Sequence, residues 1–359
     1  MTDTTIKAGN SVINFSREVM TEYFNKSGFA MYTGESENNV IQVKNEFNGK
    51  QGNKVSFPIV GQLKGDGVSG SAQLWGNEEE LSNTAILVEL GYLRNGVRVT
   101  SAEGFKSQFD VLKTARPLIV NWAANNLRNR IIEAMGSVLV PNDFLGTTDT
   151  VDINVPYSTA TAAQITAHIA NNSDRIYAGG ATITSQADIG TNAKKITSPE
   201  DLIAINTAVR ETLVDAYPIK PIEADDDAGY KWYVHFVDTY TFAQIKTALI
   251  QVNQMGEVRG KSNPLFREGD IVFDGVTYRQ IPELANAAVS LSNGTSNVNV
   301  HRSFVAGAQS VLLSYGRADT IRTQDFDYGF QSGVAIETCR GISKGSVNGK
   351  GLLFEVWTI

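Results

Sequence analysis

The feature that most constrains this chain is a long glycine-rich stretch between two strand-like segments. Residues 55–60 (VSFPIV) and 85–90 (AILVEL) are rich in the β-branched and aliphatic residues typical of strands. The intervening GQLKGDGVSGSAQLWGNEEELSN has few apolar residues and no periodicity. A loop of this length inside a compact domain is uncommon and usually functional. We therefore expect a projecting hairpin, and because an isolated hairpin is only marginally stable, we expect it to rest on a neighbouring subunit.

The tip of this hairpin supplies the candidate contact residues. An aromatic side chain in polar surroundings more often anchors into a partner than stays in water, and Trp75 stands in such surroundings. Packing of Trp75 within its own loop is the alternative. The predicted inter-subunit contacts are Leu74, Trp75, Glu78, Glu79 and Lys64, and the predicted loop-tip glycines are Gly65, Gly67, Gly70 and Gly76.

Composition narrows the class of function. The chain has 359 residues, 42% of them hydrophobic and only 19% charged, and its net charge is −7. A low charged fraction suits a protein that buries much surface against neighbours. Basic residues are scattered, with no run of Lys or Arg longer than two, so direct tight binding of DNA is not expected. An acidic balance is compatible with lying beside DNA without adhering to it.

Cysteine content and hydropathy exclude two further classes. Cys339 is the only cysteine, so no intrachain disulfide forms, and we interpret it as a small buried hydrophobe rather than a reactive thiol. The first residues lack the apolar core of a secretory signal, and no run of 18 apolar residues predicts a membrane span. We expect synthesis in a reducing cytoplasm.

A long helix is the strongest periodic signal, over residues 101–139. Its apolar residues recur largely along one face: Phe105, Phe109, Leu112, Ile119, Trp122, Leu127, Ile131, Ile132 and Met135. Pro117 predicts a kink or a restart of the helix near residues 115–117.

Shorter elements are expected along the rest of the chain. Ser198 and Pro199 predict a capped helix running to about residue 216. Other predicted helices cover 15–29, 160–171 and 238–254, and predicted strands cover 40–43, 230–237, 270–273, 277–281, 300–306, 333–339 and 352–359. Most of the segment 140–198 has no readable pattern.

Three enzyme-like motifs occur, and each fails on its context. Gly65 to Gly70 match G-x-G-x-x-G, but no helix is predicted to follow and hold a pyrophosphate. The sequence around Ser343 matches G-x-S-x-G, yet all three histidines precede it. The Gly260-Lys-Ser triplet lacks the required earlier glycine and is followed by Pro264.

Metal ligands are not indicated either. His168, His235 and His301 show no metal-ligand spacing. The acidic cluster of Glu223 with residues 225–227 is interpreted as a solvated loop in preference to a weak surface ion site. We predict no catalytic, cofactor or metal site and no enzymatic activity.

Residues 39–81 resemble the major capsid protein family typified by the N4 phage. The matching positions are Lys44, Glu46 and Phe47, then Gly52, Val55, Phe57 and Pro58, then Gly65 to Gly70, and finally Leu74, Gly76, Asn77, Glu78 and Glu79. The likeness continues more loosely to residue 139 and through NPLFREGDIVFDGVTYRQIPEL. No pattern matches within 140–198.

The resemblance implies an α+β chain with the capsid fold of the Hong Kong 97 (HK97) type. It implies an N-terminal arm at 1–38 and an extended loop at 39–88. A peripheral domain would cover 89–199, with a spine helix at 101–139 and an irregular insertion at 140–198. Residues 200–332 would form mostly the axial domain, and 333–359 would supply C-terminal strands of the peripheral domain.

The implied function is that of a major capsid protein in the virion. The chain would assemble with itself into hexamers and pentamers of an icosahedral or prolate phage head around double-stranded DNA. A scaffolding protein, a portal and decoration proteins would be further partners, with DNA held by proximity and no membrane involved. The alternative is an extracellular, adhesin-like β protein of similar composition.

Overall fold

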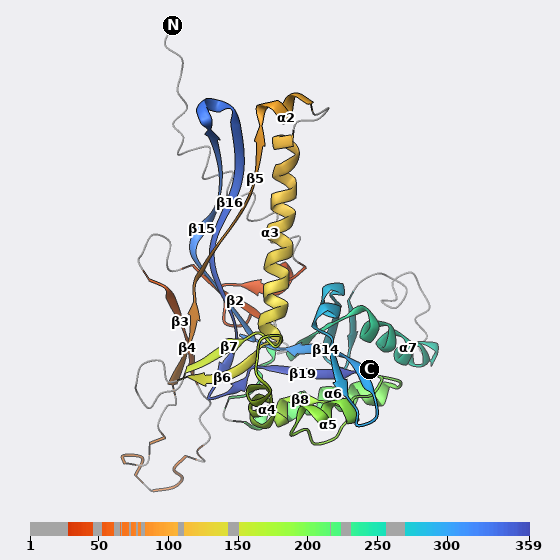
Figure 1. The fold of residues 1–359 in the computed structure, drawn as a ribbon. Coiled ribbons are helices and arrows are strands. Elements are labelled where there is room, and N and C mark those ends of the chain that lie inside the picture. The colour runs from red at the N-terminus through yellow and green to blue at the C-terminus, as the bar shows by residue number, and fades with distance from the viewer. Residues whose placement is uncertain are drawn as a thin grey trace.

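The computed structural model describes residues 28–45, 52–60, 65, 67–71, 73–76, 78–79, 83–106, 111–142, 151–215, 217–223, 231–255 and 270–359. Two units stand out in Figure 1: a broad body at the base and a long narrow blade that rises from it. Nearly all of the helix predicted at 15–29, and the whole 260–262 motif, lie outside the described residues. No helix of the described chain is long and apolar enough to cross a bilayer.

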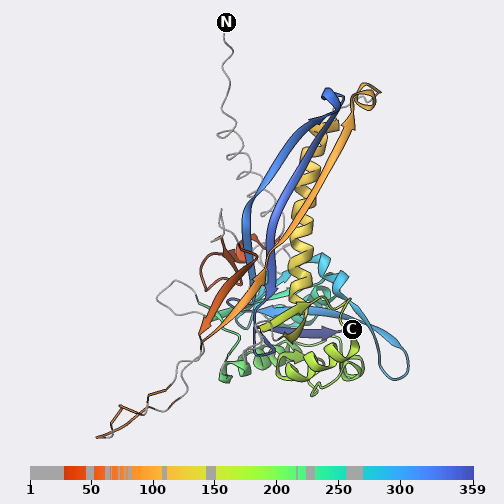
Figure 2. The same ribbon diagram turned by 60° about the vertical axis from the view of Figure 1, so that its left-hand side comes forward.

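The blade consists of three long strands and one helix. Its elements are β5 (Gly91–Thr100), α3 (Val111–Met135), β15 (Val311–Phe326) and β16 (Gln331–Lys344). Antiparallel pairing of β15 with β16 extends from Val311 opposite Lys344 to Phe326 opposite Gln331, with bulges beside Arg317. The sheet order is β1 (Thr33–Gly34), β2 (Ile41–Lys44), β15, β16 and β5, and α3 lies along one side of the three long strands (Figures 1 and 2).

Helix α3 confirms the predicted long helix but corrects two of its details. The helix runs without a break through Pro117, so the predicted restart there is wrong. Pro117 is exposed, while a buried row continues past it, and packing on the sheet offsets the single hydrogen bond that proline removes. Phe105 belongs to the separate helix α2 (Ser101–Lys106) and is 93% exposed, so it does not share the buried face. That buried row is Ala115, Ile119, Ala123, Leu127, Ile131 and Met135.

The body is built on an eight-stranded sheet. The strand order is β11 (Ile271–Phe273), β12 (Val276–Gln280), β10 (Lys231–Val237), β14 (Asn297–Ala306), β19 (Leu353–Thr358) and β8 (Ile176–Tyr177), with β13 (Val289–Ser292) on β14 and β9 (Ile222–Glu223) on β10. One face packs on α6 (Pro199–Glu211) and α7 (Thr239–Met255) through Val237, Val305 and Ile245. The other face, through Phe236 and Phe304, packs toward α3. Both faces of this sheet are therefore covered.

Several predicted elements are confirmed in the body. Ser198 caps α6, with its hydroxyl accepting the Asp201 N–H, and Pro199 is the first helical residue. The Asp274-Gly275 turn joins β11 to β12, and both residues have positive φ. The segment 140–198 is more regular than expected: it contains α4 (Ala162–Asn171), α5 (Gln186–Asn192), β8 and most of the pair β6 (Val138–Asn142) and β7 (Val151–Val155).

Two long strands were not predicted. Strands β5 and β15 are polar along much of their length and show no regular apolar alternation, so the sequence pattern does not predict them. The predicted strands 333–339 and 352–359 both exist, but they belong to different sheets: the first is part of β16 in the blade, and the second is β19 in the body. The two C-terminal segments therefore do not form one unit, because the turn between them leads the chain from blade to body.

The projecting hairpin is formed by β3 (Lys54–Val60) and β4 (Asn83–Glu89), paired antiparallel from Lys54 opposite Glu89 to Val60 opposite Asn83. Alternate residues such as Phe57 and Ile86 pack with Leu312 in a small core of their own. The described residues of the intervening loop lie beyond the hairpin's end, away from body and blade (Figures 1 and 2). The predicted hairpin is thus anchored at its base and extended at its tip.

Candidate functional site

The tip of the projecting hairpin presents its apolar side chains to solvent. Trp75 is 85% exposed and Leu74 is 60% exposed. The alternative of local packing for Trp75 is therefore wrong within the isolated subunit. Glu78 and Glu79 are exposed as well, and Lys64 lies outside the described residues.

Two glutamates hold the loop backbone in shape. The Gly65 N–H donates to Glu79 Oε2 at 2.6 Å, and the Gly76 N–H donates to Glu78 Oε2 at 2.7 Å. Gly76 has a φ of +85°, a left-handed conformation that favours glycine over any residue with a Cβ. Glutamates and glycines of the loop itself therefore define the conformation of the tip. The described residues that directly follow Gly70, up to Glu79, form no helix whose N-terminus could hold a phosphate.

The other enzyme-like motif is part of a strand. Ser343 lies in β16, is buried, and accepts a hydrogen bond from Asn154. A nucleophilic serine needs an exposed hydroxyl on a sharp turn with a histidine in reach, and this one is paired within a sheet. His235 is likewise enclosed: its Nε2 lies 2.9 Å from Ser303 Oγ, and burial lowers its pKa to about 3.

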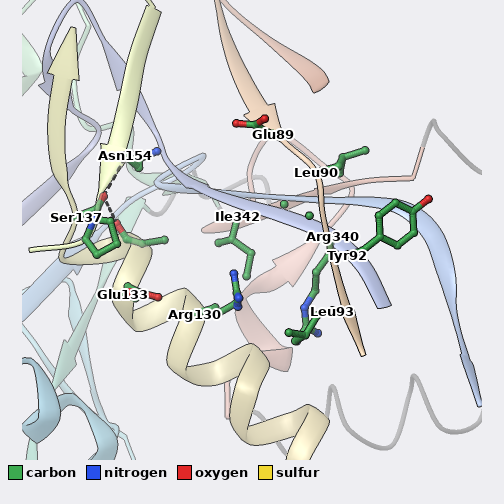
Figure 3. Close-up of a pocket in the computed structure, with 14 residues that line it drawn as sticks. Glu89, Leu90, Tyr92, Leu93, Arg130, Glu133, Ser137, Asn154, Arg340 and Ile342 are labelled. Carbon is green, nitrogen blue, oxygen red and sulfur yellow. Dashed lines mark hydrogen bonds between the residues drawn. The ribbon is translucent and has the colours of Figure 1, made fainter. Parts of the chain in front are cut away.

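A cavity of about 440 Å³ opens where the hairpin, the blade and β7 meet (Figure 3). Glu89 of the hairpin strand β4 and Leu93 of the blade strand β5 line it, together with Arg130 and Glu133 of α3. Arg340, which donates to Asn126 Oδ1 at 2.8 Å, forms its wall on β16. No histidine, cysteine or group of metal ligands is among the described residues around it.

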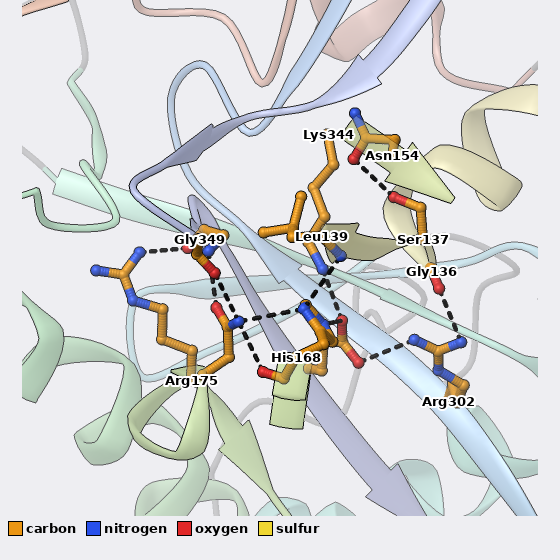
Figure 4. A network of polar contacts seen from close by, with 12 residues as sticks. Gly136, Ser137, Leu139, Asn154, His168, Arg175, Arg302, Lys344 and Gly349 are labelled. Carbon is orange, nitrogen blue, oxygen red and sulfur yellow. Dashed lines mark hydrogen bonds and ion pairs between the residues drawn. The ribbon is translucent and has the colours of Figure 1, made fainter. Parts of the chain in front are cut away.

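A buried ionic network occupies the junction of body and blade (Figure 4). Glu355 stands in the middle of β19, whose residues are buried on both faces. It accepts hydrogen bonds from Lys344 Nζ at 2.7 Å and from Arg302 Nη2 at 2.9 Å. Burial alone would raise the pKa of Glu355, but the charges of Lys344 and Arg302 outweigh it and hold the pKa well below its usual range.

Arg302 is enclosed on its other sides by aromatic rings. Its guanidinium carbon lies 4.5 Å from the centre of the Trp357 ring and 4.7 Å from that of Tyr157. Its Nη1 donates to the Gly136 carbonyl at 3.0 Å, just past the end of α3. Cation–π contacts and this hydrogen bond compensate part of the cost of removing the charge from water.

His168 connects the insertion to the same network. The Leu139 N–H donates to His168 Nδ1 at 3.2 Å, so the ring proton resides on Nε2, which lies 3.7 Å from Glu355 Oε1. Burial lowers the pKa of His168. The network resembles a catalytic constellation in composition, yet each of its charged members is at least 95% buried, so it offers no access to a substrate.

Sequence reasoning missed this network, although one signal for it was present. Glu355 is the single charged residue in the apolar run LLFEVW. A carboxylate in a strand buried on both faces requires cationic partners, but the sequence does not indicate which ones. Its partners come from β14, β16 and α4, which only the fold brings together.

Comparisons with known proteins point to one family. A sequence profile described as phage capsid protein matches residues 3–352. The major capsid protein of Pseudomonas phage KPP25 is 24% identical over 330 residues, covering 88% of this chain and 84% of that protein. The capsid of cyanophage Pam1 has a TM-score of 0.78 at 27% identity, covering 92% of this chain and 91% of that chain. The capsid of Ralstonia phage GP4 has a TM-score of 0.69 at 20% identity, covering 94% and 90%.

The geometry of the buried network predicts that substitutions of its members lower the free energy of unfolding by different amounts. Glu355→Gln leaves Lys344 and Arg302 as uncompensated buried cations and should lower the free energy of unfolding by about 3–5 kcal/mol. Lys344→Met leaves the Arg302–Glu355 pair intact and should cost clearly less. Urea unfolding of the unassembled subunit measures both, and equal losses would contradict this account.

Acid should destabilise the unassembled subunit. Burial lowers the pKa of His168, and the adjacent cations lower the pKa of Glu355. The unfolded chain therefore binds more protons than the folded chain, at the histidine once the pH falls below about 6.5 and at the glutamate once it falls below about 4.3. The free energy of unfolding should therefore decrease from pH 7 to pH 4. His168→Gln should flatten the decrease above pH 5 without abolishing it, because His235 contributes with the same sign. An unchanged slope in urea titrations at each pH would refute the role of His168.

Exposure of the loop tip predicts that Trp75 contributes nothing to the stability of a single subunit. Trp75→Ala should change the free energy of unfolding by less than about 0.5 kcal/mol. Trp357→Ala, at a residue that is 1% exposed, should cost about 3–5 kcal/mol in the same assay. A large loss for Trp75→Ala would show that the tip packs on its own subunit.

Proposed function

The chain belongs to the phage capsid protein family, and we propose that its subunits meet head to tail in hexamers and pentamers that close a head around double-stranded DNA. Such rings use heterologous interfaces, in which two different surfaces of one chain meet. Specific interfaces of about 1,200–2,000 Å² each, repeated throughout a shell, give stability from modest individual contacts. An anchored hairpin that ends in an exposed tryptophan supports this arrangement, because it supplies one such surface.

Family membership confirms the broader predictions made from the sequence. The protein is a structural component of a phage shell, it associates with itself in that shell, and it is located in the virion. It has the α+β capsid fold of the HK97 type and is not an enzyme. The adhesin-like alternative has no support from these relatives.

The extended loop is the element that we propose to join neighbours, with Leu74 and Trp75 as its apolar contacts. Burying a tryptophan removes about 150–250 Å² from water, worth at most about 4–6 kcal/mol at about 25 cal/mol per Å². The base of the hairpin is held by its own core, so the free energy gained at the tip is not consumed in folding the hairpin. The 85% exposure of the Trp75 side chain carries this part of the proposal.

The domain names remain proposals that the topology helps to define. We assign the blade to the peripheral domain, with α3 as the spine helix, and the eight-stranded sheet with α6 and α7 to the axial domain. Residues 39–88 are the extended loop and 1–38 the arm. On this division β15 and β16 belong to the peripheral domain, and β19 belongs to the axial domain.

Further partners are proposed on general grounds. We propose a separate scaffolding protein that sets the curvature of the head, a portal through which DNA enters, and decoration proteins that bind outside. The net charge of −7 disfavours adhesion to DNA, so we propose that the packaged DNA is held by enclosure.

Removing the loop tip should separate folding from assembly. Replacing residues 64–80 by a short Gly-Ser linker should leave a subunit with unchanged circular dichroism and unfolding midpoint, because the hairpin core is retained. The same variant should sediment as monomers or small rings, and electron microscopy should show no shells. Particles of wild-type appearance from this variant would refute the proposal.

A further inference from the structure

Arg340 is a buried cation whose hydrogen bonds are incomplete. It is 5% exposed and lines the cavity between β16, α3 and β7 (Figure 3). Its Nη2 donates to Asn126 Oδ1 at 2.8 Å, whereas Nε and Nη1 have no hydrogen-bond partner among the described residues. No described carboxylate forms an ion pair with it. Because a guanidinium group stays charged in proteins, the cost of burying this charge cannot be relieved by loss of a proton.

Helix α3 brings a second cation to the same cavity. Asn126, Arg130 and Glu133 follow one another at intervals of four and three residues, which places them on one side of the helix. Asn126 binds the Arg340 guanidinium, and Arg130 and Glu133 line the cavity. The two arginines therefore reach this space from different elements, Arg340 from β16 and Arg130 from α3 (Figure 3).

The carboxylates at the cavity do not neutralise Arg340. Glu89 and Glu133 both line it, but both are exposed. Charges in contact with water are screened, so their attraction for a buried guanidinium is weak beyond the distance of an ion pair. Water can accept the remaining N–H groups, but a neutral molecule leaves the charge unbalanced. The side of the cavity formed by Arg340 is therefore positive.

Gly91 leaves room beside the Arg340 guanidinium. It is directly opposite Arg340 in the pairing of β5 with β16, so a side chain at this position would point to the same side of the sheet. Apart from its chain neighbours, a Cβ at Gly91 would meet no atom nearer than the Arg340 carbonyl oxygen at 4.0 Å, and its φ is not positive. Neither packing nor backbone conformation requires a glycine here, so its effect is to keep the space open.

We propose that this cavity binds a small oxyanion of the phosphate or carboxylate type, held by Arg340 and Arg130. Its oxygens accept the Arg340 N–H groups that no described residue accepts, in charge-assisted hydrogen bonds, and its charge balances the buried cation. The volume of about 440 Å³ lies within the range of about 300–1,000 Å³ found for small-molecule sites. Leu93 and Ile342 provide apolar parts of the wall. The site is complete within one subunit.

Phosphate groups of DNA share this chemistry, but the cavity favours a free ion. A space of this volume between β5, β16, α3 and β7 admits a small ion, whereas a DNA duplex carries its phosphates on a stiff backbone that cannot enter. The net charge of −7 further disfavours adhesion of DNA to the subunit.

Titration with inorganic phosphate tests the site on the unassembled full-length subunit. Isothermal titration calorimetry, with ionic strength held constant by chloride, should give a dissociation constant of about 1 mM or lower. The midpoint of urea unfolding should rise with phosphate concentration, because only the folded chain binds the ion. A DNA duplex at the same concentration of phosphate groups should produce neither effect.

Substitutions at the cavity should change phosphate binding in opposite directions. Arg340→Met should weaken it by about 10- to 100-fold, as expected for loss of hydrogen bonds from a charged donor. Glu133→Gln removes a charge of the same sign as the ligand and should strengthen binding. Arg130→Gln should weaken binding less than Arg340→Met, because Arg130 is exposed and its charge is screened.

A carboxylate attached to the chain gives a test that retains Arg340. Gly91→Glu places an anionic group beside the guanidinium, and Gly91→Gln is the matched control of the same shape without the charge. In phosphate-free buffer, Gly91→Glu should unfold at a higher urea concentration than Gly91→Gln, because it neutralises the buried cation. Its midpoint should also no longer respond to phosphate.

The results that would overturn the inference are specific. They are absence of phosphate binding by the wild type at about 10 mM, or wild-type affinity in a folded Arg340→Met variant. If Arg340→Met does not fold, the Gly91 pair decides: equal midpoints would show that Arg340 does not require an anion. Binding of the duplex that is lost in Arg340→Met would show that the ligand is nucleic acid and not a free ion.

Discussion

The antiparallel pairing of β15 with β16 is the constraint on which the rest of the structure depends. Strand β15 runs from the core of the body to the tip of the blade and β16 returns from the tip to the core, so the hydrogen bonds between them fix how far the blade extends. Strand β5 pairs along the outer edge of β16, and β2 pairs in parallel beside the start of β15. Helix α3 then packs on one side, and the core of the hairpin rests on Leu312 on the other.

Buried ion pairs as well as apolar packing hold the blade and the body together at their junction. Apolar contacts are non-directional, whereas Glu355 must meet Lys344 and Arg302 at hydrogen-bond distance to remain ionised in the interior. A buried ion pair often adds little net stability. As a hypothesis, its value here is specificity: it fixes the relative positions of β14, β16, β19 and α4, and hence the angle from which the blade leaves the body.

The projecting hairpin and the blade leave the body in different directions (Figure 1). Surfaces of one chain that are separated in this way favour head-to-tail contact between copies, which is the geometry of closed rings.

The sequence by itself determined the local elements and the projecting hairpin. Its amphipathic helix at α3, the capped helix at Ser198 and the glycine-rich loop between two strands depend on periodicity and turn chemistry over a few residues, and all were predictable. Strands β5 and β15 were missed because they are solvated along much of their length and lack an apolar alternation. The tertiary structure alone decided the partners of Glu355 and the side of the blade sheet to which Arg94, Arg98 and Arg322 point. Those features depend on which strands pair and in which register, and a shift of one residue would turn every side chain to the opposite face.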